Sequence, residues 1–107
     1  MATINDFQAL DIRVGKILDV VELDARKPMY GLKIDLGELG VKNIAAGIKD
    51  AYPKEELVGK NVIVLVNIEP KKIANFLSEG MVLAAESEGV ISVLLSDKAI
   101  APGSKVR

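Results

Sequence analysis

The segment from Asn67 to Ala85 reads NIEPKKIANFLSEGMVLAA, and it decides how the strands around it can be arranged. Pro70 has no amide hydrogen to donate to a neighbouring strand, so the apolar run before it must end there. A lysine pair, a short apolar run with helical character and a Ser-Glu-Gly-Met entry into a new strand follow. The segment therefore predicts a connection between two strands that carries functional groups.

The side chains of this connection indicate what it could bind. Lys71 and Lys72 supply positive charge, and an amide, a hydroxyl and a thioether follow at Asn75, Ser78 and Met81. That mixture suits an anionic ligand with flat apolar faces, and nucleic acid is such a ligand. The alternative is a surface loop whose lysines only keep the chain in solution.

Three strands are expected upstream of this connection. Residues 61–66, NVIVLV, are apolar on both faces and predict a central strand. Residues 30–36 alternate between apolar and polar positions, which predicts a half-buried strand with Lys33 on its wet face. Residues 41–47, VKNIAAG, end in side chains so small that either a ligand or backbone approaches closely there, or a helix packs tightly over them. The sequence leaves these two alternatives open.

The first part of the chain predicts a short helical turn followed by a bent strand. In residues 1–9 and just beyond, apolar side chains recur every three positions, at Ile4, Phe7 and Leu10. We expect this turn to lie on the domain, with Asn5 or Asp6 as its cap. From residue 11 the pattern alternates and then changes phase next to Gly15, which predicts a β-bulge at that glycine.

The remaining elements complete the expected fold. Residues 50–59, DAYPKEELVG, predict a short helix with Pro53 in its first turn and Gly59 at its end. Strands follow at 81–86 and 90–95. Five principal strands with one helix between the third and fourth match an all-β fold, the five-stranded Greek-key barrel called the OB-fold. We expect one domain, residues 1–107, with small terminal extensions.

Composition argues against catalysis. The chain has no histidine and no cysteine, so the commonest general base, the imidazole and thiolate metal ligands and the Ser-His triad are all missing. The carboxylate pairs Glu55–Glu56 and Glu86/Glu88 lie in what the pattern predicts as an exposed helix start and a hairpin turn. We therefore expect neither an enzyme nor a cofactor or metal.

The charge distribution limits how a polyanion could bind. The formal net charge is −1, so steering by the whole molecule is absent and binding needs local clustering. Residues 26–49 contain five basic side chains against two acidic ones. With only 4% aromatic residues, a site made of aromatic stacking is also excluded. The start of the chain resembles no secretory signal and no apolar run reaches membrane-spanning length, so we expect a soluble cytoplasmic protein.

Four segments follow one another along the chain: FQALDIRVGKI from Phe7, ARKPMYGLKIDLGELGVKNIAAGI from Ala25, EELVGKNVIVLVNIEPKKIANFLSEGMVLAA from Glu55 and the PGSKV ending. In this order they resemble the tRNA-binding domain family. The resemblance covers residues 7–106. That family includes stand-alone tRNA-binding proteins, the C-terminal domain or separate β-chain of methionyl-tRNA synthetase, and the CsaA export-associated proteins.

The resemblance implies an OB-fold homodimer that recognises the outer corner of tRNA. On that basis Lys33 and Lys42 would contact phosphates from the barrel face, and Asn67, Lys71 and Lys72 from the loop. Ser78 and Met81 match the family's Ser-Glu-Gly-Met stretch, whose hydroxyl and thioether lie at the groove. The N-terminal turn with Phe7 and the C-terminal hairpin are the expected dimer contact.

Two functions remain open within the family. One is a non-catalytic, structure-specific tRNA-binding protein that acts alone or as an accessory chain of methionyl-tRNA synthetase, and the NIAAGIK and GMVLAA segments are similar to the synthetase-linked domains. The other is a CsaA-type chaperone that binds unfolded export precursor proteins, and the segment ARKPMYGLKIDLGELGVK resembles CsaA.

Overall fold

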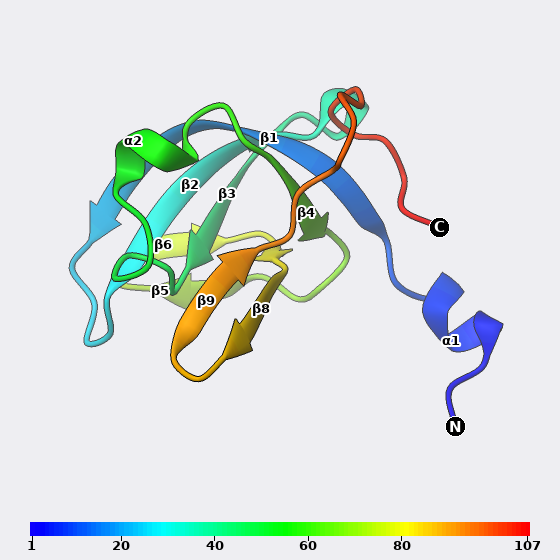
Figure 1. The fold of residues 1–107 in the computed structure, drawn as a ribbon, viewed down its shortest axis with the longest axis horizontal. Coiled ribbons are helices and arrows are strands. Elements are labelled where there is room, and N and C mark those ends of the chain that lie inside the picture. The colour runs from blue at the N-terminus through cyan, green and yellow to red at the C-terminus, as the bar shows by residue number, and fades with distance from the viewer.

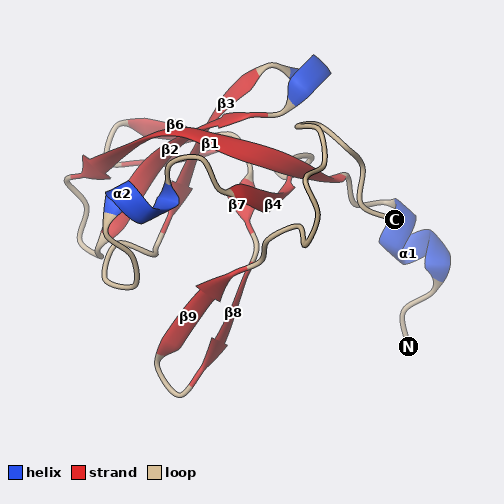
Figure 2. Ribbon diagram, turned by 45° about the horizontal axis from the view of Figure 1, so that its top comes forward, coloured by secondary structure: helices blue, strands red, loops and turns tan.

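The protein is built around one curled antiparallel sheet (Figures 1 and 2), and a computed structural model describes all 107 residues. Five strands lie in the order β3-β2-β1-β4-β7. They are β1 (Ile12–Leu23), β2 (Met29–Asp35), β3 (Val41–Ala46), β4 (Asn61–Leu65) and β7 (Met81–Val82). The predicted all-β OB-fold class is confirmed.

β1 holds the barrel together because it has two partners along its length. From Ile12 to Lys16 it pairs with β4, and from Lys16 to Leu23 it pairs with β2. The register with β2 shifts between Ile17 and Asp19. A β-bulge at this shift bends the strand, so that one strand contributes to both walls of the barrel.

Gly15 has a different role from the predicted one. The bulge expected there lies three residues further on, and Gly15 pairs in regular register with Val62 of β4. A Cβ atom at this position would press against Ile34 Cγ2 and lie 2.9 Å from Leu36 Cδ2. The glycine therefore lets the side chains at the end of β2 pass directly over β1 inside the core.

The core is aliphatic and lies between the walls of the barrel. Its most deeply buried side chains are Ile17, Leu32, Ile34, Leu36, Ile44, Leu57, Val62 and Val64. Leu57 comes from α2 (Lys54–Leu57), which stands between β3 and β4 as predicted but is shorter than the expected range. Pro53 is the N-cap of α2 and not part of its first turn.

Two hairpins extend from the barrel. The first is β5 (Lys71–Ile73) with β6 (Phe76–Ser78), where the sequence predicted a helix-like run. Ala74 and Asn75 have left-handed φ angles of 48° and 63°, which turn the chain within two residues. The second is β8 (Ala84–Ser87) with β9 (Val90–Val93), so the strand predicted over 81–86 is divided into β7 and β8.

The N-terminal helix α1 (Ile4–Gln8) is well capped but packs on nothing. Thr3 is its N-cap, and a capping box joins the Thr3 hydroxyl and the Asp6 carboxylate to each other's backbone amides. None of its residues is buried, and Figures 1 and 2 show it standing away from the barrel. The expectation that this turn lies on the domain is wrong for the single chain, and Asp6 takes part in the cap without being the N-cap itself.

Both α-helices are short. α1 has five residues and α2 has four. Neither combines the length and apolar character that a bilayer-spanning helix needs.

The 3₁₀ turn η1 (Gly37–Leu39) joins β2 to β3.

Substituting Gly15 tests the packing of β2 over β1. Gly15→Ala is expected to lower the free energy of unfolding by about 2 kcal/mol, because the added methyl group overpacks a filled core. Gly47→Ala is the matched control, since a Cβ there meets only Met29 Sδ at 3.4 Å. Urea unfolding of both variants measures the difference, and equal stabilities would contradict the packing role of Gly15.

Candidate nucleic-acid interface

The β5–β6 hairpin lies against the face of the sheet that points away from the core. The ring of Phe76 packs over Gly31, where a Cβ atom would lie 2.7 Å from the ring carbon Cε1. Gly31 is paired with Ala45 across the β2–β3 ladder, so the two small residues lie on the same outer face. Their size allows the hairpin to approach the sheet closely.

The Ser-Glu-Gly stretch after the hairpin closes the barrel against β3. Ser78 Oγ accepts a hydrogen bond from Ala45 N at 2.9 Å and donates to the carbonyl of Gly80 at 3.1 Å. The backbone amide of Glu79 donates to Asn43 O at 2.8 Å, and its carboxylate accepts from Asn43 N at 3.0 Å. Ser78 is buried, and its hydroxyl is held by the protein's own backbone.

A cationic hollow lies where the β1–β2 loop meets β5. Its walls are Ala25, Arg26, Lys27, Met29, Lys71 and Ile73, and it measures about 380 Å³. Three of these residues are cations and none is acidic. Two segments more than forty residues apart in the sequence thus combine their positive charges at one place. The net charge of the whole chain, −1, gives no indication of this local cluster.

A central hollow shares lining residues with the cationic hollow, and an apolar hollow shares lining residues with the central one. The central hollow is lined by Ala45, Ile68, Glu69, Lys71, Ile73, Ser78, Gly80 and Met81. The apolar hollow is lined by residues 45–48, 81–86 and Ile91, and it measures about 320 Å³. Lys71 belongs to the first two hollows and Met81 to the last two. At Ala45 the group that approaches closely is the Ser78 hydroxyl, which accepts a hydrogen bond from the Ala45 backbone amide.

The predicted lysines do not all lie together. Lys33 is paired with Asn43, whereas Lys42 is paired with Ile34 of the core, so the two lysines point to opposite faces of the sheet. The expectation that one barrel face carries both is therefore wrong. Lys33 also faces Asp19 of β1 across the ladder. On β5, Lys71 lines two hollows, and Lys72, the next residue, alternates to the other side.

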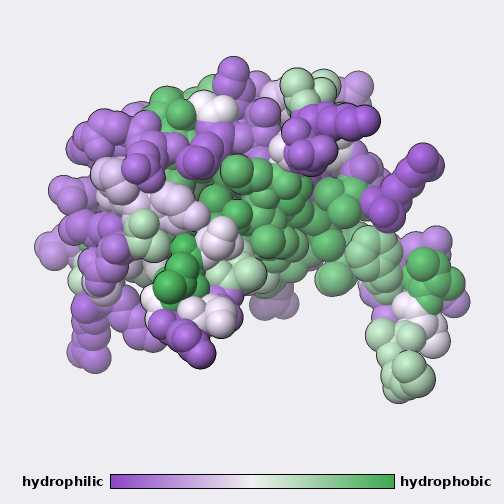
Figure 3. Space-filling model, in the orientation of Figure 1, coloured by the Kyte–Doolittle hydropathy of each residue, from purple (hydrophilic) through white to green (hydrophobic).

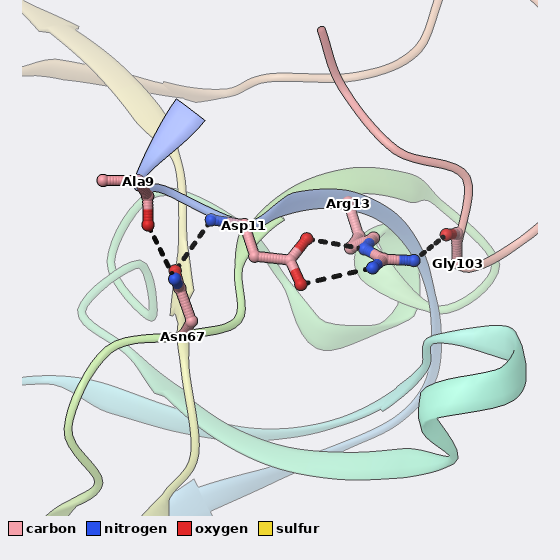
Figure 4. A network of polar contacts seen from close by, with 5 residues as sticks. All are labelled: Ala9, Asp11, Arg13, Asn67 and Gly103. Carbon is pink, nitrogen blue, oxygen red and sulfur yellow. Dashed lines mark hydrogen bonds and ion pairs between the residues drawn. The ribbon is translucent and has the colours of Figure 1, made fainter. Parts of the chain in front are cut away.

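Asn67 lies at one end of the barrel, just after β4. Its side-chain oxygen accepts from Asp11 N at 2.8 Å, and its amide nitrogen donates to Ala9 O at 2.8 Å (Figure 4). These are the bonds that a strand neighbour would make, and they attach the segment after α1 to the end of β4. Asn67 is therefore a structural residue in this chain, and none of the three hollows includes it.

A charged pair next to Asn67 holds the C-terminal segment. Arg13 donates to both carboxylate oxygens of Asp11, from Nε to Oδ1 at 2.7 Å and from Nη2 to Oδ2 at 3.2 Å (Figure 4). Its remaining nitrogen, Nη1, donates to the carbonyl oxygen of Gly103 at 3.0 Å. The hydrogen bond from the guanidinium lowers the pKa of Asp11 below its ordinary value. The carboxyl group in turn raises the pKa of Arg13.

Arg26 and Lys27 were not among the predicted site residues, although both stand in a cluster of basic residues in the sequence. The signal that could have singled them out is their position in the loop between the first two strands. In OB-folds that loop, together with the one after the fourth strand, lies beside the ligand face. Lys71 of the second segment meets them at the cationic hollow.

The fold and this hollow define a class of protein: a small OB-fold barrel with a cationic groove between two loops. Residues 12–105 match the family model described as "Putative tRNA binding domain". The chain belongs to the tRNA-binding domain family.

Curated relatives carry this domain as a small part of a larger protein. The chain is 46% identical over 100 residues to the methionine–tRNA ligase of Methanococcus vannielii, which covers 94% of the chain and 15% of the ligase. The chain is 44% identical to the same enzyme of Nanoarchaeum equitans, and the match covers 95% of the chain and 13% of the ligase. The chain thus spans about one seventh of the length of these relatives.

Solved structures of similar length share the whole fold. The CsaA chaperone protein from Picrophilus torridus is 45% identical with a TM-score of 0.94 and covers all of both chains. CsaA from Bacillus anthracis is 36% identical with a TM-score of 0.93 and covers 100% of this chain and 99% of that one. The MetRS related protein from Pyrococcus horikoshii is 30% identical, with a TM-score of 0.92 and coverages of 100% and 98%.

The ion pair at Asp11 gives a prediction about pH. Because the pKa of Asp11 is lowered by folding, its stabilising effect is complete above the ordinary value of 3.8 and is lost as the pH falls through the lower, folded value. Asp11→Asn should therefore unfold at lower urea than the parent at pH 7, and the gap should close below pH 3.8. Asp97→Asn, an exposed carboxylate outside the network, is the control. A gap that is independent of pH would contradict this role.

Proposed function

We propose that this chain is a non-catalytic tRNA-binding module and that the cationic hollow is its phosphate-binding site. The observation that carries the proposal is the meeting of Arg26, Lys27 and Lys71, with no acidic wall residue, on a domain of this family. Local positive charge supplies most of the affinity for a nucleic-acid backbone. Because the rest of the molecule is slightly acidic, binding is confined to this place and favours a folded RNA that presents phosphates there.

The residues expected to contact RNA fall into two groups. Lys71 and Met81 line the hollows. Lys33 on the outer face of the sheet, Lys72 on β5 and Lys42 on the opposite face of β3 have long flexible side chains that could follow a phosphate backbone. Ser78 and Asn67 act indirectly in this proposal, because their polar groups are bonded within the chain and hold the groove in shape.

The relatives favour a role beside methionyl-tRNA synthetase. In the archaeal ligases a segment similar to this chain belongs to the synthetase itself. A chain of this kind would increase the effective concentration of tRNA near a catalytic domain, either as an accessory chain or as an independent cytoplasmic tRNA-binding protein.

Self-association is part of the proposal, because one face of the chain is apolar and uncovered. In α1, Ile4 is 68% exposed and Phe7 is 37% exposed, although the capping box shows that this helix is well formed. Figure 3 shows apolar surface extending from the barrel towards α1, and Leu94 and Leu95 are exposed after β9. A second copy would cover this face and double the number of cationic hollows available to one RNA.

Removing one charge from the cationic hollow tests the tRNA proposal. Lys71→Gln is expected to weaken tRNA binding at low salt and to reduce the slope of log affinity against log salt by about 1, because one phosphate contact is lost. Lys54→Gln removes the same charge from α2, next to Asp19 and Glu55, and should leave the slope unchanged. Fluorescence titration between 50 and 200 mM salt, a range over which such contacts respond strongly, gives both values. Absence of tRNA binding by the parent protein would refute the proposal.

A charge placed on α1 tests the dimer. Phe7→Glu should weaken self-association at least about tenfold, because a carboxylate would have to be buried in an apolar contact. Leu18→Glu, at the exposed bulge of β1, is the control and should leave association unchanged. Sedimentation equilibrium measures both, and a parent protein that is monomeric at all concentrations would exclude the dimer.

A CsaA-type chaperone is the second candidate. The observation in its favour is the apolar hollow beside Met81, which could accept an apolar segment of an unfolded protein. The similarity to two CsaA structures over the whole chain supports the same possibility. The chaperone function ranks second because an apolar peptide segment would leave Arg26, Lys27 and Lys71 of the cationic hollow without anionic partners.

A further inference from the structure

We propose that the three hollows form one groove for an unpaired RNA nucleotide, with its phosphate at the cationic end and its base in the apolar end beside Met81. The inference rests on the proposed tRNA binding and specifies the part of the RNA that this site takes. It predicts that the groove discriminates an unpaired base from a paired one.

Shared lining residues show that the three hollows adjoin one another. Lys71 and Ile73 line both the cationic and the central hollow, and Ala45 and Met81 line both the central and the apolar hollow. A ligand that extends along these walls meets positive charge first and apolar surface last. A nucleotide has the same order of chemistry along its length, from an anionic phosphate to a base with apolar faces.

The apolar end is the right size and shape for a single base. Its volume of about 320 Å³ lies at the lower end of the range of small-molecule sites, about 300–1,000 Å³, and is too small for a double helix. Its floor includes small residues at and just after the end of β3, Ala45, Ala46 and Gly47, which leave the faces of a base room to enter.

The chemistry of the walls also fits a base. The polarisable thioether of Met81 makes favourable contacts with flat ring systems, and Met81 is exposed enough to do so. The carboxylates of Glu69 and Glu86, in the central and apolar hollows, can accept hydrogen bonds from the amino groups at a base edge. A base inside a duplex hides both of its faces by stacking, so only an unpaired base can use this end of the groove.

The cationic end favours a nucleotide over an extended apolar peptide. Arg26, Lys27 and Lys71 would stay unpaired beside a neutral peptide but would be neutralised by phosphates. The apolar and cationic parts of the groove are therefore used together only by a ligand that carries both kinds of group.

A pair of RNA hairpins tests the inference directly. One carries a single bulged 2-aminopurine nucleotide, whose fluorescence reports its surroundings, and the other is the same hairpin fully paired. The parent protein should bind the bulged hairpin about tenfold more tightly, in the range that contact with one base supplies. The 2-aminopurine fluorescence should change on binding.

Filling the apolar end should remove this preference without removing charge. Ala84 is exposed and is one of the residues that line the apolar hollow. Ala84→Leu should bind both hairpins equally and keep the salt slope of the parent. Ala101→Leu adds the same bulk at an exposed alanine of the C-terminal turn and should behave as the parent. Met81→Ala, which removes the thioether and adds no bulk, should also reduce the preference.

The outcomes separate this inference from the proposed function. Lys71-dependent binding of tRNA with equal affinity for the two hairpins would overturn the inference and leave the proposed function intact. Absence of binding to tRNA and to both hairpins would overturn both. If Ala84→Leu leaves the bulged hairpin bound but abolishes binding of an unstructured leucine-rich peptide, the apolar end takes peptide and the inference is wrong.

Discussion

The hydrogen bonds between the 78–79 segment and β3 are the contacts on which the rest of the structure depends. β3 is an edge strand, and β7 pairs with β4 over only two residues, so the sheet alone leaves the barrel open between β3 and β7. Ser78 and Glu79 satisfy the backbone amides of Ala45 and Asn43 and so close that gap. The same bonds fix the β5–β6 hairpin over the outer face, which brings Lys71 to the β1–β2 loop.

Closure by side chains has a consequence for the site. A regular strand in this place would present another row of alternating side chains and fill the space beside β3. Instead the chain passes quickly from β6 to β7, and the small residues at the end of β3 stay accessible from the apolar hollow. Structural polar groups and an open groove therefore occur in the same short segment, and the Ser-Glu-Gly-Met sequence serves both.

The opposite end of the barrel is held by a separate set of polar contacts. Asn67 ties the segment after α1 to β4, and Arg13 ties Asp11 to the C-terminal segment at Gly103. The segment after α1 and the C-terminal segment are thus attached to the barrel, although no residue of α1 itself is buried. The apolar side chains of α1 are exposed, as are Leu94 and Leu95 after β9, and α1 stands away from the barrel (Figure 1).

The sequence by itself determined the fold class. Strands are indicated by alternating apolar and polar residues and by the prolines and glycines that end them, and both signals depend only on local spacing. The alternation over 30–36, the apolar run over 61–66 and the helix region before it all correspond to observed elements. Family membership was likewise readable from ordered motifs along nearly the whole chain.

Only the tertiary structure decided which of those residues meet. The register of β2 and β3 separates Lys33 from Lys42, and the bulge in β1 lies away from Gly15, since both depend on pairing between distant strands. Asn67 and Ser78 have side chains that suit a ligand, but backbone groups far away in the sequence occupy them. Arg26 and Lys27 lie beside Lys71 because closure of the barrel brings one loop onto the other. Local sequence patterns do not report how close two such distant segments lie in space.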